Sequence, residues 1–320
     1  MNLTFDVVIT TYNRPEHIVK FCKEILQCSP KPNKLIVIDS SDATNKELQS
    51  NTEVIYRKSS HKSQPYQRYV GYLVSSADIL VFFDDDLEIK DNSLFETIAN
   101  TFIKNKDLIG LGLGIDYHNP ISTTLIKPSH NIFNTILKVL RPKILPGQIT
   151  RFGQTAALPQ KNIDTTFLPG PNMCFNRNML EDVFDETMFA LFEKKMGMGE
   201  DKVISMRVAA KGKMMYLGEK TYLYHPPIES TYFNNLITFW AKVFYSRIWI
   251  AHQYNKINPS HFHHIWVLLF IIKSNLTINS VSKLKSILLA IKWVAKYGYI
   301  QRHIIGPKIN YYEDAKRDAA

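Results

Sequence analysis

Three consecutive aspartates, Asp84, Asp85 and Asp86, follow an apolar run from Ile79 to Phe83. Neighbouring carboxylates raise one another's pKa and destabilise a fold unless a cation compensates their charge. A set of oxygen ligands without cysteine favours Mg²⁺ or Mn²⁺ over zinc. The triplet therefore predicts a divalent cation at the end of a buried strand.

Three apolar runs of strand length position these and other polar residues. The runs lie at 5–15, 34–44 and 77–86, are rich in β-branched and aromatic residues, and end in polar residues. A helical pattern at 16–28 separates the first two runs. Strands that alternate with helices predict an α/β fold with a mainly parallel sheet. In such sheets the ligand lies beyond the carboxyl ends of the strands.

The polar residues that close the runs are expected to converge on that edge. They are Thr10, Tyr12 and Arg14 in the first run, Asp39 in the second, and the three aspartates in the third. Taken alone, the first group is also typical of a helix start, and Asp39 is typical of a turn or an N-cap. The shared edge is what favours a common binding site.

The order of six motifs resembles the family 2 glycosyltransferases with the GT-A fold. The motifs are "VVITTYNRP", "LIVIDSSD", "QRYVGY", "LVFFDDDLEI", "PGPNMCFNR" and "GMGED", and they cover about residues 4–225. The resemblance implies an inverting, metal-dependent enzyme of the hexosyltransferase type. Such an enzyme moves a sugar from a nucleotide diphosphate to an acceptor hydroxyl. The cation would neutralise the charge that builds on the leaving diphosphate.

The resemblance assigns the nucleotide to the first two runs. Thr10, Tyr12 and Arg14 would hold the base and the ribose, with the Tyr12 ring stacked on the base. Asp39 would accept a hydrogen bond from the imide N–H of uracil or thymine. A UDP- or dTDP-sugar is therefore the expected donor.

The same resemblance assigns the phosphates and the cation. Arg68 would bind a phosphate as a charge-assisted fork, although Tyr69 stands where the family usually has Asn. Asp84 would contact the ribose, or the metal through water, and Asp86 would bind the metal directly. Asp85 would belong to the donor site or point back into the fold.

The resemblance also implies residues on the acceptor side. Asp201 would take the proton of the acceptor hydroxyl and Glu200 would contact the acceptor, although both acids also suit a helix N-terminus as caps. Gly170 and Asn172 would line the sugar pocket, where glycine lets the backbone approach the donor. His225 ends a further strand pattern and either completes the Mn²⁺ or Mg²⁺ site or is structural.

The C-terminal part of the chain differs in charge from the rest. Residues 230–320 hold 12 basic and 3 acidic side chains, whereas residues 1–229 hold 27 and 26. This asymmetry predicts a catalytic domain at 1–229 and a basic helical extension at 230–320. Within the catalytic domain, we expect a nucleotide-binding half at about 1–100 and an acceptor half at about 101–229.

Apolar residues recur at helical spacing in the extension, with Lys285, Lys292 and Lys296 beside them. Basic amphipathic helices can lie in a membrane interface against anionic lipid, and ordinary packing onto the catalytic domain is the alternative. No nucleic-acid motif accompanies the basic charge, so we expect no nucleic-acid partner. The apolar run "IWVLLFII" at 265–272 is too short to span a bilayer, which takes roughly 20 residues.

These observations predict an enzyme at the inner face of the cell membrane. The three cysteines lack metal or disulfide spacing and the N-terminus lacks a secretory pattern, so we expect a cytoplasmic protein. The acceptor would be a glycan or a lipid-linked saccharide in cell-surface polysaccharide biosynthesis. Two alternatives stay open, namely a nucleotidyltransferase acting on sugar phosphates and a non-catalytic protein that binds nucleotide sugars.

Overall fold

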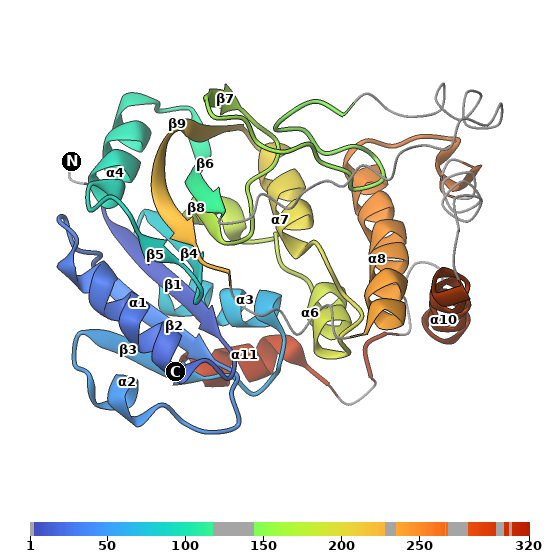
Figure 1. The fold of residues 1–320 in the computed structure, drawn as a ribbon, viewed down its shortest axis with the longest axis horizontal. Helices are drawn as coiled ribbons and strands as arrows, with labels where there is room; N and C mark the ends of the chain where they lie inside the picture. Colours follow the sequence, from blue (N-terminus) through green and yellow to red (C-terminus); the bar gives the residue numbers. More distant parts are fainter. Residues whose placement is uncertain are drawn as a thin grey trace.

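A large mixed sheet forms the centre of the protein (Figure 1). The computed structural model describes residues 3–117, 144–227, 235–265, 267, 281–298, 304–306 and 309–320. The strands run in the order β3-β2-β1-β4-β8-β6-β9-β5, with β7 paired to β9.

The first four strands are parallel to one another, as the sequence predicts. They are β1 (Phe5–Thr11), β2 (Lys34–Asp39), β3 (Val54–Lys58) and β4 (Ile79–Asp84). The helices that connect them are α1 (Pro15–Gln27), α2 (Lys46–Ser50) and α3 (Gln64–Val74). Prolines at the first turns of α1 and α3 suit those positions, because a first-turn N–H has no partner within the helix.

The second half of the sheet introduces antiparallel pairing. Strand β8 (Asn172–Asn176) runs antiparallel to both β4 and β6 (Leu108–Tyr117), and β9 (Lys213–His225) runs parallel to β6. The remaining elements are β5 (Glu88–Ile89), α4 (Leu94–Lys104), β7 (Asn162–Asp164), the short 3₁₀ helix η1 (Arg177–Leu180), α6 (Glu186–Glu193) and α7 (Glu200–Ala209).

Successive side chains of the central strands enter two separate hydrophobic cores. Val7 and Ile9 of β1 pack with α1 and α4 on one face, whereas Val8 packs with α3, α6 and α7 on the other. Because both faces are covered, the strands are apolar along most of their length. Figure 1 shows α1 and α4 on the first side and α3 on the second. Polar residues are thereby confined to the strand ends.

Within the described residues, three C-terminal helices follow the sheet, which confirms the predicted helical extension. They are α8 (Leu236–Ile257), α10 (Val281–Tyr297) and α11 (Tyr311–Ala319). Helix α8 packs against α7 and α10, and α11 returns to α3 and β3, more than 200 residues earlier in the chain (Figure 1). Most of the apolar run at 265–272 lies outside the described residues. Among the described helices, none is both long and apolar enough to cross a membrane.

Candidate active site

A pocket of about 820 Å³ opens at the carboxyl ends of β1 and β4. Its walls combine the ends of these strands with the segment after α6 and the first turns of α8. The lining residues discussed below are Thr10, Tyr12, Arg14, Lys62, Gln64, Asp84, Asp85, Asp86, Phe192, Lys195, Thr238, Phe239 and Lys242. A pocket of this size suits a nucleotide-sized ligand.

Arg14 compensates two of the three consecutive aspartates. Its Nη1 atom lies 2.8 Å from Asp85 Oδ1 and 2.8 Å from Asp86 Oδ2. Asp85 Oδ2 accepts a further hydrogen bond of 2.6 Å from the Thr11 hydroxyl. Burial raises the pKa of Asp85, and the nearby Arg14 charge opposes that rise. Asp85 therefore points towards the end of β1, where it holds Arg14 in place.

Arg68 compensates the third aspartate from beneath the pocket. This fully buried guanidinium lies 2.9 Å from Asp84 Oδ1 and 2.8 Å from Glu200 Oε1, and it donates to the Gly170 carbonyl at 3.0 Å. Gln64 also donates to Asp84 Oδ1 at 2.8 Å. Burial raises the pKa of Asp84, while the Arg68 charge lowers it. Both Arg68 and Glu200 are engaged within the protein, away from the open part of the pocket.

Asp86 retains one carboxylate oxygen that suits a cation. Asp86 Oδ1 is buried, accepts no hydrogen bond from the described residues, and lies 3.5 Å from His225 Nε2. The His225 Nδ1 atom lies 3.1 Å from the Pro226 carbonyl, which favours a proton on Nδ1 and a free lone pair on Nε2. An oxygen and an imidazole nitrogen fit Mn²⁺ or Mg²⁺. The described residues contain no cluster of three such side chains, so a cation here needs further ligands from substrate or water.

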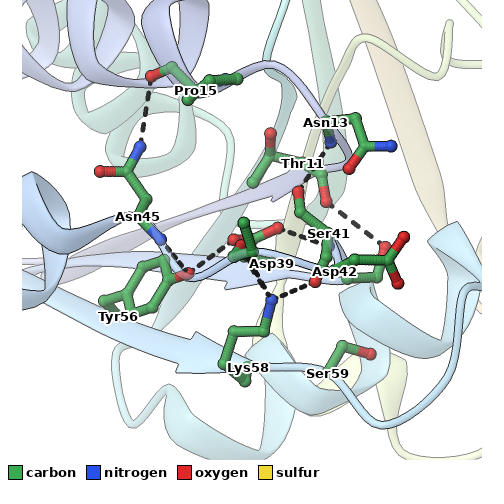
Figure 2. Close-up of polar contacts among 12 residues, drawn as sticks. Thr11, Asn13, Pro15, Asp39, Ser41, Asp42, Asn45, Tyr56, Lys58 and Ser59 are labelled. Carbon is green, nitrogen blue, oxygen red and sulfur yellow. Dashed lines mark hydrogen bonds and ion pairs between the residues drawn. The ribbon is translucent and has the colours of Figure 1, made fainter.

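Asp39 ends β2 within a network of fixed donors, which Figure 2 shows. Its Oδ1 atom accepts from the Ser41 backbone N–H at 2.7 Å, and its Oδ2 atom accepts from the Tyr56 hydroxyl at 2.5 Å. Lys58 Nζ lies 3.7 Å from Oδ2 and also donates to the Ser41 carbonyl. These contacts fix the orientation of a carboxylate that is 2% exposed.

Tyr12 presents an open aromatic surface beside this network. The residue is 43% exposed, and the Lys62 ammonium lies 5.4 Å from the centre of the ring. Thr10 pairs with Asp84 across the β1–β4 ladder and its hydroxyl lies 3.5 Å from Gln64 Nε2. The ends of the first, second and fourth strands therefore meet at one edge, as the sequence predicts.

Asp201 lies at the start of α7, next to the loop before β8. Its Oδ2 atom accepts from the Gly170 backbone N–H at 3.3 Å, and its Oδ1 atom accepts from the Lys202 backbone N–H at 2.9 Å. The Gly170 backbone therefore forms hydrogen bonds with both Asp201 and Arg68. Asn172, by contrast, is fully buried in β8 and donates to the Leu113 carbonyl at 2.7 Å.

Several residues in or near the pocket escape prediction from the sequence. Tyr56 and Gln64 hold the carboxylates from behind, and they lie in a strand and a helix that the apolar runs do not predict. Other pocket residues come from distant segments and carry no motif: Phe192, Lys195, Thr238, Phe239 and Lys242. Tyr117 is a further neighbour, because its ring lies 5.6 Å from that of His225 at the ends of β6 and β9. Tyr117 is the last residue of β6, and this position at the end of a strand could have indicated from the sequence that it lies near the site.

The fold and the acidic strand edge define the class of the GT-A glycosyltransferases. The structure of S. aureus TarS 1–349 in complex with UDP-GlcNAc is similar with a TM-score of 0.52 and 13% identity, over 94% of this chain and 90% of that one. GalNAc-T7 with UDP, GalNAc and Mn²⁺ has a TM-score of 0.54 and 15% identity, over 94% of this chain and 58% of that one. At such identities the similarity shows the fold alone.

Sequence comparison gives the family. The model of glycosyl transferase family 2 matches residues 6–184, which is more than half of the chain. The chain therefore belongs to glycosyl transferase family 2, and the predicted family and GT-A fold are confirmed. Among proteins of curated function, no sequence match is found.

Proposed function

We propose that this glycosyltransferase is an inverting enzyme of the hexosyltransferase type. It moves a sugar from a UDP- or dTDP-sugar to a hydroxyl of a glycan or lipid-linked saccharide in cell-surface polysaccharide biosynthesis. One observation carries the proposal: Asp84, Asp85 and Asp86 line a donor-sized pocket, and the buried Asp86 Oδ1 accepts no hydrogen bond from the described residues and lies 3.5 Å from His225 Nε2. Membership of the family supplies the reaction class.

The donor nucleotide occupies the edge formed by β1 and β2. The exposed Tyr12 ring stacks on the base, and Asp39 accepts the imide N–H of uracil or thymine. Thr10 and Arg14 support the ribose side of this site. The complexes of TarS with UDP-GlcNAc and of GalNAc-T7 with UDP support a uridine nucleotide.

Asp86 and His225 are the residues that would hold Mn²⁺ or Mg²⁺, with Asp84 next to them. When bound, the cation neutralises the negative charge that develops on the leaving diphosphate. Arg14 holds Asp86 in place through the second carboxylate oxygen. Arg68, buried beneath Asp84, stabilises that carboxylate and receives support from Glu200.

Asp201 acts as the base for the acceptor. Its carboxylate takes the hydroxyl proton as the acceptor oxygen bonds to the anomeric carbon, and the bond from that carbon to the diphosphate oxygen breaks. Attack from the face opposite the leaving group inverts the anomeric centre. The Gly170 backbone N–H holds Asp201 Oδ2 at 3.3 Å and thereby orients the carboxylate.

We also infer peripheral contact with the inner face of the cell membrane through helix α10. Leu284, Leu288 and Ile291 lie at helical spacing and are 53%, 58% and 56% exposed. Lys285 and Lys292 are exposed on the same helix, which contains no acidic residue. An apolar stripe with lysines beside it suits a surface of anionic lipid.

A thermal-shift panel of nucleotide sugars tests the donor assignment without an acceptor. A ligand that binds only the folded state raises the melting temperature by mass action. We expect UDP- or dTDP-sugars to raise it in the presence of Mn²⁺ and guanine or adenine nucleotide sugars to do so less. Equal shifts for all nucleotide sugars would count against Asp39 as the base-recognising residue.

A further inference from the structure

Two lysines form a basic wall on the acceptor side of the pocket. Lys195 follows α6, and Lys242 lies in the first turns of α8. Both line the same pocket as the three aspartates. Figure 1 shows α6 and α8 on the side of the molecule away from β1, β2 and β3, which carry the nucleotide edge. The basic wall therefore belongs to elements other than those that hold the donor nucleotide.

The fold keeps Lys195 in a backbone conformation that favours glycine. Its φ angle is 55°, and the turn is held by hydrogen bonds from Lys195 N to the Phe192 carbonyl and from Met196 N to the Leu191 carbonyl. A residue in this conformation after a helix is usually glycine or asparagine. A strained residue that lines a functional pocket indicates a use for its side chain.

Lys242 and Lys195 line the same pocket, and their two positive charges repel each other. Burial lowers the pKa of Lys242, and the Lys195 charge lowers it further. Among the described residues, no ion pair engages Lys195. An anion between the two ammonium groups would relieve the repulsion and form charge-assisted hydrogen bonds with both.

A short segment of the chain joins the basic wall to the proposed base. The segment 196–199 leads from Lys195 to Glu200 and Asp201 at the start of α7. The Ser246 hydroxyl of α8, within hydrogen-bonding distance of the Met196 carbonyl at 3.4 Å, ties α8 to this segment. The basic wall therefore lies in the segment that leads to Asp201 and in the helix that contacts this segment. Phe192 and Phe239 line the pocket beside it and offer apolar contact to a carbon skeleton.

We propose that Lys195 and Lys242 bind a phosphate group of the acceptor, so that the enzyme glycosylates a phosphate-bearing molecule. The proposal rests on the glycosyltransferase function proposed above. Lysine ammonium groups recognise phosphate as point charges, each with three donors. The alternative source of phosphate is the donor itself, whose diphosphate lies near Asp86, and the experiment separates the two.

The test uses the full chain saturated with UDP and Mn²⁺, so that the donor phosphate site is filled. sn-Glycerol 3-phosphate is titrated as the probe and glycerol as its neutral counterpart, with binding measured by calorimetry. We expect glycerol 3-phosphate to bind in the presence of UDP and glycerol not to bind. In the Lys195→Gln/Lys242→Gln variant, its Kd should rise about tenfold or more, the effect of losing charge-assisted hydrogen bonds.

Lys194→Gln is the matched control, because Lys194 is the exposed neighbour of Lys195 and does not line the pocket. We expect this variant to bind the probe as the unmodified chain does. The proposal is overturned if UDP displaces glycerol 3-phosphate, if the double variant loses UDP affinity instead, or if the probe binds equally to all variants or to none. If the unmodified chain does not bind UDP with Mn²⁺, this result would instead contradict the proposed function.

Discussion

Two arginines compensate the negative charge of the three consecutive aspartates. Arg14 lies between Asp85 and Asp86, and Arg68 lies between Asp84 and Glu200. A buried carboxylate needs such a partner, because burial without one carries a large free-energy cost. Asp86 Oδ1 is buried and accepts no hydrogen bond from the described residues. The two arginines thus compensate much of the charge of the acidic cluster, and the proposed divalent cation concerns Asp86.

Replacing Asp86 with asparagine tests this position. Asp86→Asn keeps the shape of the side chain but removes the charge that holds the cation, so we expect Mn²⁺ affinity to fall about 100-fold. Mn²⁺ binding can be followed by electron paramagnetic resonance in the presence of UDP. Asp107→Asn, at an exposed turn far from the pocket lining, is the control and should bind Mn²⁺ normally. Equal Mn²⁺ affinity in both variants would refute the metal assignment.

Replacing Asp201 separates catalysis from donor binding. Asp201→Asn can still accept the Gly170 N–H but cannot take a proton, so we expect transfer to slow by about 10²- to 10⁴-fold. UDP-sugar affinity, measured by calorimetry, should change little. Undiminished turnover would remove Asp201 as the base, and loss of donor affinity would indicate a role in binding instead.

Helix α11 holds the segment between β3 and α3 in place through hydrogen bonds and an ion pair. His61 in that segment lies 2.8 Å from Glu193 of α6 and 2.9 Å from Asp314 of α11. Asp318 accepts hydrogen bonds of 2.8 Å from the Ser60 backbone, the Ser60 hydroxyl and the Tyr66 hydroxyl. Lys62 and Gln64, which line the pocket, follow directly. Helix α11 therefore helps to hold one wall of the pocket in place.

This contact predicts a pH-dependent stability. Burial lowers the pKa of His61, but the hydrogen bonds with Glu193 and Asp314 outweigh it and raise the pKa overall. The stabilisation is complete below the pKa of unfolded histidine, about 6.5, and is lost as pH rises through the higher folded value. We therefore expect the free energy of unfolding, measured with urea, to fall as pH rises through that window.

His61→Gln should remove this dependence and lower the free energy of unfolding at pH 6 by about 2 kcal/mol, the contribution of hydrogen bonds to charged groups. His17→Gln, on the exposed side of α1, is the control and should keep the dependence. A pH profile that stays the same in the His61 variant would show that another group is responsible.

The sequence predicted the elements with strong local patterns and missed those defined by distant contacts. The runs that became β1, β2 and β4 are apolar along most of their length because both faces of the sheet are covered, and their polar ends place Asp39 and Asp86 at one edge. The pairing of Asp314 with His61 joins residues 253 positions apart, and no local pattern records it. The same holds for Lys195 and Lys242, which come from separate segments of the chain and line one pocket.

At the scale of the whole molecule, α10 turns part of its apolar surface outward. Ile287 and Ala290 are buried, whereas Leu284, Leu288 and Ile291 are exposed. Leu284, Ile287, Leu288 and Ile291 recur at helical spacing in the sequence, which predicts a single apolar face. The structure divides them between packing within the protein and an outer stripe, and helix α8 supplies the inner contact. Packing within the protein accounts for the inner side of this helix, and membrane contact of the outer stripe stays a prediction.

The outer stripe can be tested by flotation with vesicles containing anionic lipid. We expect the unmodified chain to float with them and a Leu288→Glu/Ile291→Glu variant to lose binding, because each apolar side chain contributes about 1.5–3 kcal/mol when buried. Ile103→Glu replaces an equally exposed apolar residue on α4 and should leave flotation unchanged. Full flotation of the double variant would exclude α10 as the contact.

The most direct test of the central claim is the product formed from a UDP-sugar with Mn²⁺. The proposed reaction releases UDP as the sugar passes to an acceptor or slowly to water, so UDP should accumulate with the unmodified chain. It should accumulate at least about 100-fold more slowly with Asp86→Asn. UDP can be quantified by chromatography, with Asp107→Asn as the active control. Cleavage of the UDP-sugar to UMP and sugar 1-phosphate in place of UDP, or no UDP from any nucleotide sugar, would contradict a glycosyltransferase acting through this site.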